Sequence, residues 1–352
     1  MRFGLAFLLI STLLAACGNP ATTPDALDSG GFTDVQTVED LSVDVALDAT
    51  PQVDVEPDIP TDVMVSAVCP KALIAVAEGT DVVPGTVLHL SCAPLAGQPA
   101  TSCFWTVAQP VGSVAKFQPS DTGVAVQFVP QLTGLYTIQV EAKYAGIQQP
   151  CQAQAAVAVM NDTAITAELT WHTPADKDET DKGVCAGADL DLHFAHPWAD
   201  MADLDGDGLP DPWFDPKFDC FWGNPAPDWG SADPNIDDDP HFSGDDADGA
   251  GPEDVALTLP EDGKTYTIGV HVWNSCGFGN SLATLRVYAY GQLLFEDTVE
   301  LKSGDLWRVA TLDWPSADVL GCLKGKQKCI TPCYAPPAAL ALSKPGTPTA
   351  CP

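Results

Sequence analysis

Alternating aspartates between residues 203 and 211 are the side chains of this sequence whose spacing best suits a chemical task. Asp occupies every second position, a glycine follows the third Asp, and a fourth Asp comes three residues after that glycine. A tight loop with this spacing directs several hard oxygen ligands at one Ca²⁺ ion. The predicted ligands are Asp203, Asp205, Asp207, Asp211 and the backbone carbonyl of Leu209.

The loop departs from the helix–loop–helix pattern in two ways. Phe214 stands where a bidentate Glu would close the ion shell, and the flanking sequence has no helical period. The DxDxDG spacing is closer to, and resembles, the loops of thrombospondin type 3 repeats. The missing ligand is therefore expected from Asp215 or Asp219. The alternative is a solvated acidic loop without an ion.

A second acidic stretch, residues 237–253, is a further candidate for cation binding. Its carboxylates flank a glycine-rich turn without strict spacing, and the candidate ligands are Asp245, Asp246, Asp248 and Glu253.

Residues 189–194 read DLDLHF, a polar–apolar alternation typical of a strand. Asp189, Asp191 and His193 would share one face. The aspartates could bind Ca²⁺ or orient the long loop, or as a carboxylate pair could serve acid–base hydrolysis. His193 together with His196 and His271 could instead form a Zn²⁺ site, because imidazole suits transition metals.

Composition restricts the partners. The 352 residues carry 48 Asp and Glu against 15 Lys and Arg, a formal charge of -33, and 45% are hydrophobic. Such a surface repels nucleic acid and anionic headgroups and attracts divalent cations, so no nucleic-acid partner is expected. Twelve cysteines behind an export signal indicate disulfides in an oxidising compartment.

Residues 1–16 have the pattern of an export signal, with Arg2 ahead of an apolar run. Leu14–Cys17 resembles the lipobox of bacterial lipoproteins. That resemblance implies cleavage before Cys17, acylation of Cys17 and a membrane anchor; Gly18 after it favours the outer membrane, facing periplasm or medium. Residues 17–66 are acidic and proline-rich with a single aromatic side chain, and we expect a disordered tether.

Residues 67–162 are predicted to form an antiparallel β-sandwich, because short β-type runs recur between turn signals. PGTVLHLSC, CFWTVAQPVGS and TGLYTIQVEA in this segment resemble the PKD-like branch of immunoglobulin-like domains. The resemblance implies that Trp105 is the core tryptophan of a central strand and that Tyr136 opens a late strand.

Residues 163–315 are predicted to form a second, jelly-roll-like sandwich, so the expected fold class is all-β. The long stretch between Phe194 and Val255 lacks strand periodicity but is rich in aromatics, which indicates a loop ordered by aromatic packing and a bound cation. ELTWHTPADKDETDKG, AGADLDLHF, DGDGLPDPWFD and YTIGVHVWN resemble an uncharacterised acidic domain of Gram-negative surface lipoproteins. That resemblance implies a surface location and cation binding, and no known reaction.

The cysteines allow specific pairings. Four lie in the first predicted domain, where three connectivities are open; we favour one that staples neighbouring strands and joins the first strand to the last. Residues 316–352 contain four more and look like a disulfide-stapled tail, while Cys220 is the candidate for an unpaired thiol. The favoured pairs are Cys69–Cys151, Cys92–Cys103 and Cys185–Cys276.

The sequence therefore predicts a calcium-stabilised, non-catalytic interaction or structural module of the cell envelope, with an unknown protein or glycan ligand. Two alternatives remain at this point. A calcium-dependent carbohydrate binder would present Trp222 or Trp229 to sugar rings, and a metal-dependent hydrolase of envelope or extracellular polymers would use the paired carboxylates.

Overall fold

The computed structural model describes residues 69, 73–322, 329–341 and 344. The predicted leader, Cys17 and the acidic tether lie outside the described residues. Within the described part the chain is almost entirely β-structure, and the short helix α1 (Ala338–Ala341) is an exception. The expected all-β fold class is confirmed.

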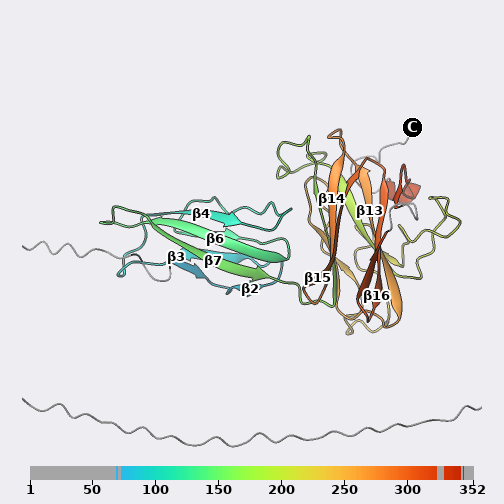
Figure 1. Cartoon of the computed structure of the whole chain (residues 1–352), viewed down its shortest axis with the longest axis horizontal. Coiled ribbons are helices and arrows are strands. Elements are labelled where there is room, and N and C mark those ends of the chain that lie inside the picture. Colours follow the sequence, from blue (N-terminus) through green and yellow to red (C-terminus); the bar gives the residue numbers. More distant parts are fainter. Residues whose placement is uncertain (1–68, 70–72, 323–328, 342–343, 345–352) are drawn as a thin grey trace, which may run out of the picture. The chain divides into compact units, whose positions relative to one another are not determined.

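The first sandwich consists of two sheets (Figure 1). One sheet has the order β1 (Ile74–Val76), β3 (Leu88–Cys92) and β5 (Ala125–Phe128). The other has the order β2 (Asp81–Val82), β7 (Cys151–Val159), β6 (Gly134–Lys143) and β4 (Ser102–Ala108). β2 pairs with β7 in parallel, which differs from the wholly antiparallel expectation. After β1 the chain crosses from the first sheet to the edge of the second sheet, where it forms β2. Because β2 and β7 are not joined by a hairpin, they can pair in parallel.

Two aromatic side chains close the core of the first sandwich. Trp105 is fully buried and its indole N–H donates to the carbonyl of Gly123, at 2.9 Å. Tyr136 is also fully buried, and its hydroxyl donates to the carbonyl of Leu132 while accepting from the Leu132 N–H. Both rings thus bury their apolar bodies with satisfied polar atoms, as such side chains require.

The second sandwich also has two sheets. One has the order β11 (His241–Phe242), β12 (Glu253–Leu257), β8 (Ile165–His172), β14 (Ser281–Ala289) and β15 (Gln292–Leu301). The other has the order β10 (Asp219–Cys220), β9 (Asp189–Ala195), β13 (Lys264–Asn274), β16 (Leu306–Trp314) and β17 (Asp318–Gly321), with β18 (Ile330–Thr331) also on β16. Leu190, Leu192 and Phe194 of β9 point into the shared core, as their alternation predicts.

The opposite face of β9 is buried as well, because the long loop between β9 and β12 folds over it. Trp213, Phe214 and Phe221 are each at most 2% exposed and form a second cluster with Leu306 and Tyr334. The loop is fastened to the sandwich at both ends, since β10 pairs with β9 and β11 pairs with β12. Aromatic packing therefore orders this loop.

The second sandwich continues past residue 315. β17 and β18 both pair with β16, and Tyr334 packs into the aromatic cluster under the long loop. The first part of the predicted cysteine-rich tail thus belongs to the sandwich, because its short strands satisfy backbone groups of β16 that would otherwise form an open edge.

The favoured disulfides are present. Cys69–Cys151 and Cys92–Cys103 lie in the first sandwich, and Cys185–Cys276 joins the approach to β9 to the turn after β13. Cys322–Cys329 closes a short loop after β17. Cys220 is a buried free thiol.

Candidate cation sites

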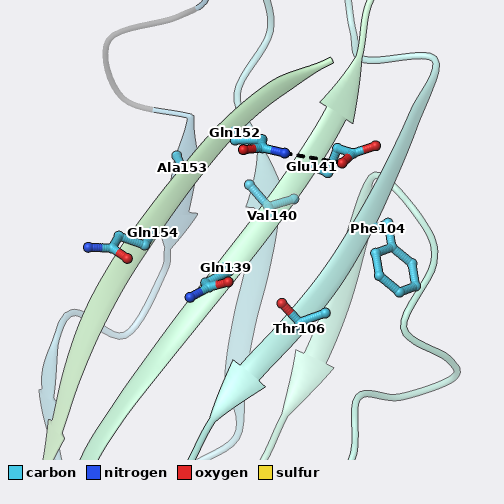
Figure 2. A pocket seen from close by; sticks show the side chains of 8 residues that line it. All are labelled: Phe104, Thr106, Gln139, Val140, Glu141, Gln152, Ala153 and Gln154. Atoms are coloured by element: carbon cyan, nitrogen blue, oxygen red, sulfur yellow. Dashed lines mark hydrogen bonds between the residues drawn. The ribbon is translucent and has the colours of Figure 1, made fainter. Parts of the chain in front are cut away.

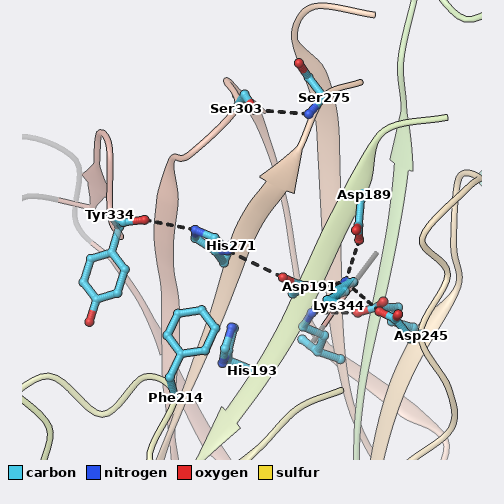
Figure 3. Close-up of polar contacts among 12 residues, drawn as sticks. Asp189, Asp191, His193, Phe214, Asp245, His271, Ser275, Ser303, Tyr334 and Lys344 are labelled. Atoms are coloured by element: carbon cyan, nitrogen blue, oxygen red, sulfur yellow. Dashed lines mark hydrogen bonds and ion pairs between the residues drawn. The ribbon is translucent and has the colours of Figure 1, made fainter. Parts of the chain in front are cut away.

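Four carboxylates converge at the start of β9, and we call them the acidic cage: Asp189, Asp191, Asp245 and Glu253. The ammonium of Lys344 lies among them (Figure 3). Its Nζ donates to Oδ1 of Asp189 at 2.8 Å and to Oδ1 of Asp191, and it pairs with Oδ1 of Asp245 at 2.8 Å. A cation held by three carboxylate oxygens shows that the geometry of the cage suits positive charge.

Different elements position the carboxylates of the cage. Asp189 and Asp191 share the face of β9 that points away from the core, whereas Asp245 lies in the loop before β12. Glu253 begins β12, and it accepts the Leu192 N–H on Oε2 at 2.7 Å. The cage therefore joins both sheets of the second sandwich to the long loop.

Burial and crowding set the electrostatics of the cage. Burial raises the pKa of Asp189 to about 8, and the Asp191 carboxylate adds to this shift. Burial also raises the pKa of Glu253 well above its usual range. Burial alone would raise the pKa of Asp191, but the Lys344 ammonium and His271 together outweigh burial and lower this pKa. Burial and mutual repulsion therefore make it unfavourable for all the acidic groups of the cage to be ionised beside a single ammonium.

Around the ammonium, aromatic rings and an imidazole complete the cage. Lys344 Nζ lies 5.0 Å from the ring centroid of Trp222 and 5.4 Å from that of Trp273. His271 Nδ1 lies 3.5 Å from Oδ2 of Asp191. This Oδ2 atom has no hydrogen bond among the described residues. The other ring nitrogen of His271, Nε2, contacts the Tyr334 carbonyl at 3.2 Å. Oδ2 of Asp191 is thus a fully buried carboxylate oxygen near the Lys344 ammonium that is available to bind a metal ion.

The remaining carboxylates of the second acidic stretch point elsewhere. Asp246 and Asp248 both pair with the ammonium of Lys182, at 3.2 and 2.9 Å. Asp246 also accepts the Gly251 N–H, and Asp248 accepts the Gly183 N–H. The predicted set therefore divides, and only its outer members, Asp245 and Glu253, join the aspartates of β9.

The loop of residues 203–211 has the compact form that its spacing predicts. Oxygen atoms of Asp203, Asp205 and Asp207 lie within 4.8 Å of one another. Asp203 accepts the N–H groups of Gly206 and Gly208, at 2.7 and 2.9 Å. Both glycines have positive φ, 75° and 89°, which permits the tight turn. Three carboxylates held this close suit a divalent cation, because they repel one another without one.

Asp211 ties this loop to the aromatic cluster. It is fully buried, and its Oδ2 accepts from the Leu204 N–H at 2.7 Å and from the Tyr334 hydroxyl at 3.0 Å. Its Oδ1 has no hydrogen bond among the described residues, and burial raises its pKa. The Leu209 N–H donates to Oδ1 of Asp207 and continues the turn. The loop thus offers a buried carboxylate oxygen without a hydrogen bond, in addition to the carboxylates of Asp203, Asp205 and Asp207.

Neither side chain proposed as the missing ligand belongs to this carboxylate group. Asp215 accepts three backbone N–H groups, those of Asp200, Lys217 and Phe218. Asp219 is fully buried and contacts His193 Nδ1 at 2.6 Å. Both carboxylates instead stabilise the path of the chain around the aromatic cluster, outside the group of Asp203, Asp205 and Asp207.

The three histidines of the alternative Zn²⁺ site have separate partners. His193 contacts Asp219 beneath the rings of Phe214 and Phe221, and His196 Nε2 contacts Glu261 at 3.0 Å. His271 lies beside Asp191 and Tyr334. Within the described residues, neither group of candidate ligands includes a histidine. A site built from these three imidazoles is not formed.

The aromatic side chains of the long loop are mostly packed inside. Trp229 is 3% exposed and stacks with Phe194 and Tyr266, and Trp222 packs against Trp273. Trp198 differs, being 56% exposed with the Lys264 ammonium 3.8 Å above its ring. A platform of exposed rings for sugars is therefore not formed by Trp222 and Trp229.

The first sandwich has a shallow cavity of about 440 Å³ on the outer face of β4, β6 and β7 (Figure 2). Phe104, which is 47% exposed, borders it, and Gln152 donates to the carboxylate of Glu141 at 3.3 Å. The other lining residues are Thr106, Gln139, Val140, Ala153 and Gln154. Amide groups beside one exposed ring suit a polar contact surface.

No family model and no curated protein matches the sequence. No helix among the described residues is long and apolar enough to cross a membrane.

Three solved structures show low similarity. Surface layer protein SbsC, domains 4-9, has 14% identity and a TM-score of 0.20, covering 64% of this chain and 30% of that one. The Yersinia pseudotuberculosis adhesin InvE has 13% identity and a TM-score of 0.18, covering 65% and 59%. A titin segment has 13% identity and a TM-score of 0.17, covering 65% and 97%. This chain thus spans less than two thirds of the first two proteins, and these scores carry no functional argument.

Lys344 is a residue of the cage that no motif in the sequence singles out. The lysine stands alone among Ser, Pro and Gly near the end of the chain, and no spacing connects it to residues 189–253. The available signal was the sign of its charge, because an ammonium in so acidic a chain is attracted to carboxylates. Only the folded chain shows which carboxylates those are.

Proposed function

We propose that this protein is a cell-envelope lipoprotein that acts as a non-catalytic interaction or structural module, with its second sandwich stabilised by Ca²⁺. The carboxylate cluster of the 203–211 loop carries the proposal. Its oxygen-only ligands suit Ca²⁺ better than a transition metal. The disulfides support an oxidising compartment outside the cytosol.

A structural role for the ion follows from the position of the loop. Asp211 bonds to Tyr334, and Tyr334 stacks with Phe214 in the aromatic cluster over β9. Neutralising the carboxylates of residues 203–207 removes their mutual repulsion and holds the loop against this cluster. The ion would therefore stabilise the long loop that folds over β9, next to the buried aromatic cluster.

Chelation is the direct test. Extracellular calcium modules bind with Kd of about 10⁻⁴–10⁻³ M. Free Ca²⁺ at about a hundred times Kd should stabilise the second sandwich by about 2.7 kcal/mol for one site. We expect a chelator to lower its melting temperature in calorimetry and to expose the loop of residues 194–255 to protease.

The matched variant is Asp205→Ala combined with Asp207→Ala, which should abolish the Ca²⁺ response of the loop and leave the first sandwich folded. A variant with Asp237→Ala, an exposed carboxylate of the same long loop, is the control and should respond as the wild type does. If chelator changes neither melting nor proteolysis of the wild type, the loop is a solvated acidic turn and the calcium proposal is wrong.

Anchoring is tested separately. Cys17→Ser removes the acyl acceptor that the lipobox-like motif implies, so the protein should move from the membrane fraction to the soluble fraction. Mass spectrometry of the mature N-terminus gives the second readout. Retention of the variant in membranes, with no acyl mass on Cys17 in the wild type, would contradict the lipoprotein assignment.

A further inference from the structure

The acidic cage holds less positive charge than its carboxylates can bind. One ammonium contacts Asp189, Asp191 and Asp245, and Glu253 stands behind them with both oxygens on backbone N–H groups. A divalent cation would offset this crowding better than a single ammonium does, because the attraction between charges grows with the charge of the ion. Carboxylate oxygens are also the ligands that Ca²⁺ prefers.

An ion can reach the cage from solvent. A cavity of about 250 Å³ has Asp189 on its wall, together with Asp248 and the disulfide of Cys185 and Cys276. On another side, the Asp245 side chain is 32% exposed although the Lys344 side chain is 1% exposed. A hydrated cation could therefore meet carboxylates of the cage without opening the hydrophobic core.

The ammonium and a metal ion would use the same atoms. Lys344 Nζ lies 2.8 Å from carboxylate oxygens of both Asp189 and Asp245. Ca²⁺ binds oxygens at about 2.3–2.6 Å, so its position would overlap that of the ammonium. We propose that the acidic cage is an exchange site, which holds either the Lys344 ammonium or one Ca²⁺ ion. This inference rests on the proposed calcium binding and adds a second, regulated site to it.

Two consequences follow from mutual exclusion. Binding of Ca²⁺ in the cage expels the Lys344 side chain into solvent. Conversely, Lys344 weakens the apparent affinity of the cage for Ca²⁺, because only the fraction of molecules with an empty cage can bind the ion. If the ammonium occupies the cage at least nine-tenths of the time, the apparent affinity falls by about tenfold or more.

The first experiment measures the reactivity of Lys344 in the wild-type full chain. The protein is treated with an amine-acylating reagent with chelator or with about 10 mM Ca²⁺, well above the Kd range of extracellular calcium modules. Acylation of each lysine is quantified by peptide mass spectrometry. We expect Lys344 to be protected in chelator and to react at least about tenfold faster in Ca²⁺. Lys143, an exposed residue at the end of β6 in the first sandwich, is the internal control and should not change.

The second experiment measures Ca²⁺ binding by calorimetry in the Asp205→Ala and Asp207→Ala background, so that heat from the 203–211 loop is removed. Lys344→Met removes the ammonium and keeps an apolar chain of similar length. We expect it to strengthen the remaining Ca²⁺ binding by about tenfold or more. Lys182→Met is the matched control: this lysine pairs with Asp246 and Asp248, is 67% exposed, and should change the affinity less than about threefold.

The outcomes separate the two proposals. If Ca²⁺ stabilises the wild type but Lys344 stays protected at saturation, the exchange site is overturned and the calcium-stabilised loop stands. If Ca²⁺ neither stabilises the protein nor exposes Lys344, both fail. Unchanged affinity in folded Lys344→Met also overturns the exchange. Should that variant not fold, the acylation of the wild type decides alone.

Discussion

Trp213→Ala is expected to lower the free energy of unfolding of the second sandwich by about 3–5 kcal/mol. The indole is 1% exposed and belongs to the aromatic cluster with Phe214, Phe221 and Tyr334. Its removal leaves a cavity between the long loop and β13, which the fastened loop cannot fill. Urea unfolding followed by tryptophan fluorescence measures the loss. Trp198→Ala is the control, because that ring is 56% exposed, and it should cost less than about 1 kcal/mol.

Gly269 provides a second check on the same contact. A Cβ at this position of β13 would lie 2.5 Å from the Trp213 ring, so Gly269→Ala should force the indole outward and cost about 1–3 kcal/mol. In the Trp213→Ala background the same change fills part of the cavity and should cost much less. Equal costs of Gly269→Ala in both backgrounds would show that Trp213 does not pack on β13.

Removal of the Cys185–Cys276 disulfide is expected to have an effect of similar size. Its cysteines are 91 positions apart, and the loss of loop-closure entropy predicts a cost of about 4–5 kcal/mol for the double alanine variant. The bond also borders the cavity that leads to Asp189, so the approach to the acidic cage should loosen with it. Thermal unfolding and proteolysis of the segment before β9 measure both effects.

The Cys322–Cys329 disulfide is the natural comparison, because it closes a separation of only 7 residues. The same entropy argument gives about 2.4 kcal/mol for its removal. A larger loss from this short loop than from Cys185–Cys276 would contradict the entropic account, and would mean that native contacts around Cys322 dominate.

Elements whose signals are local could be predicted from the sequence alone. Alternation placed Leu190, Leu192 and Phe194 on one face of a strand, and that face is the core of the second sandwich. The spacing of Asp203, Asp205 and Asp207 predicted a compact acidic loop. In such a loop each Asp side chain accepts a hydrogen bond from a backbone N–H two or three residues later, so the loop conformation depends only on nearby residues. Turn signals between β-type runs likewise predicted the all-β fold.

Contacts between residues far apart in the sequence could be seen only in the folded chain. The sequence left open whether the polar face of β9 binds an ion or orients the long loop. In the fold this face is buried, because the apolar rings of residues 213–221 gain more free energy by packing there than by facing water. Asp245 lies beside Asp189, whereas its sequence neighbours Asp246 and Asp248 pair with Lys182. The register of the strands and the path of the loop determine which carboxylates come together. Lys344 is about 150 residues from Asp189 and Asp191 in the sequence. Coulomb attraction between groups so far apart along the chain acts only once the fold has brought them together.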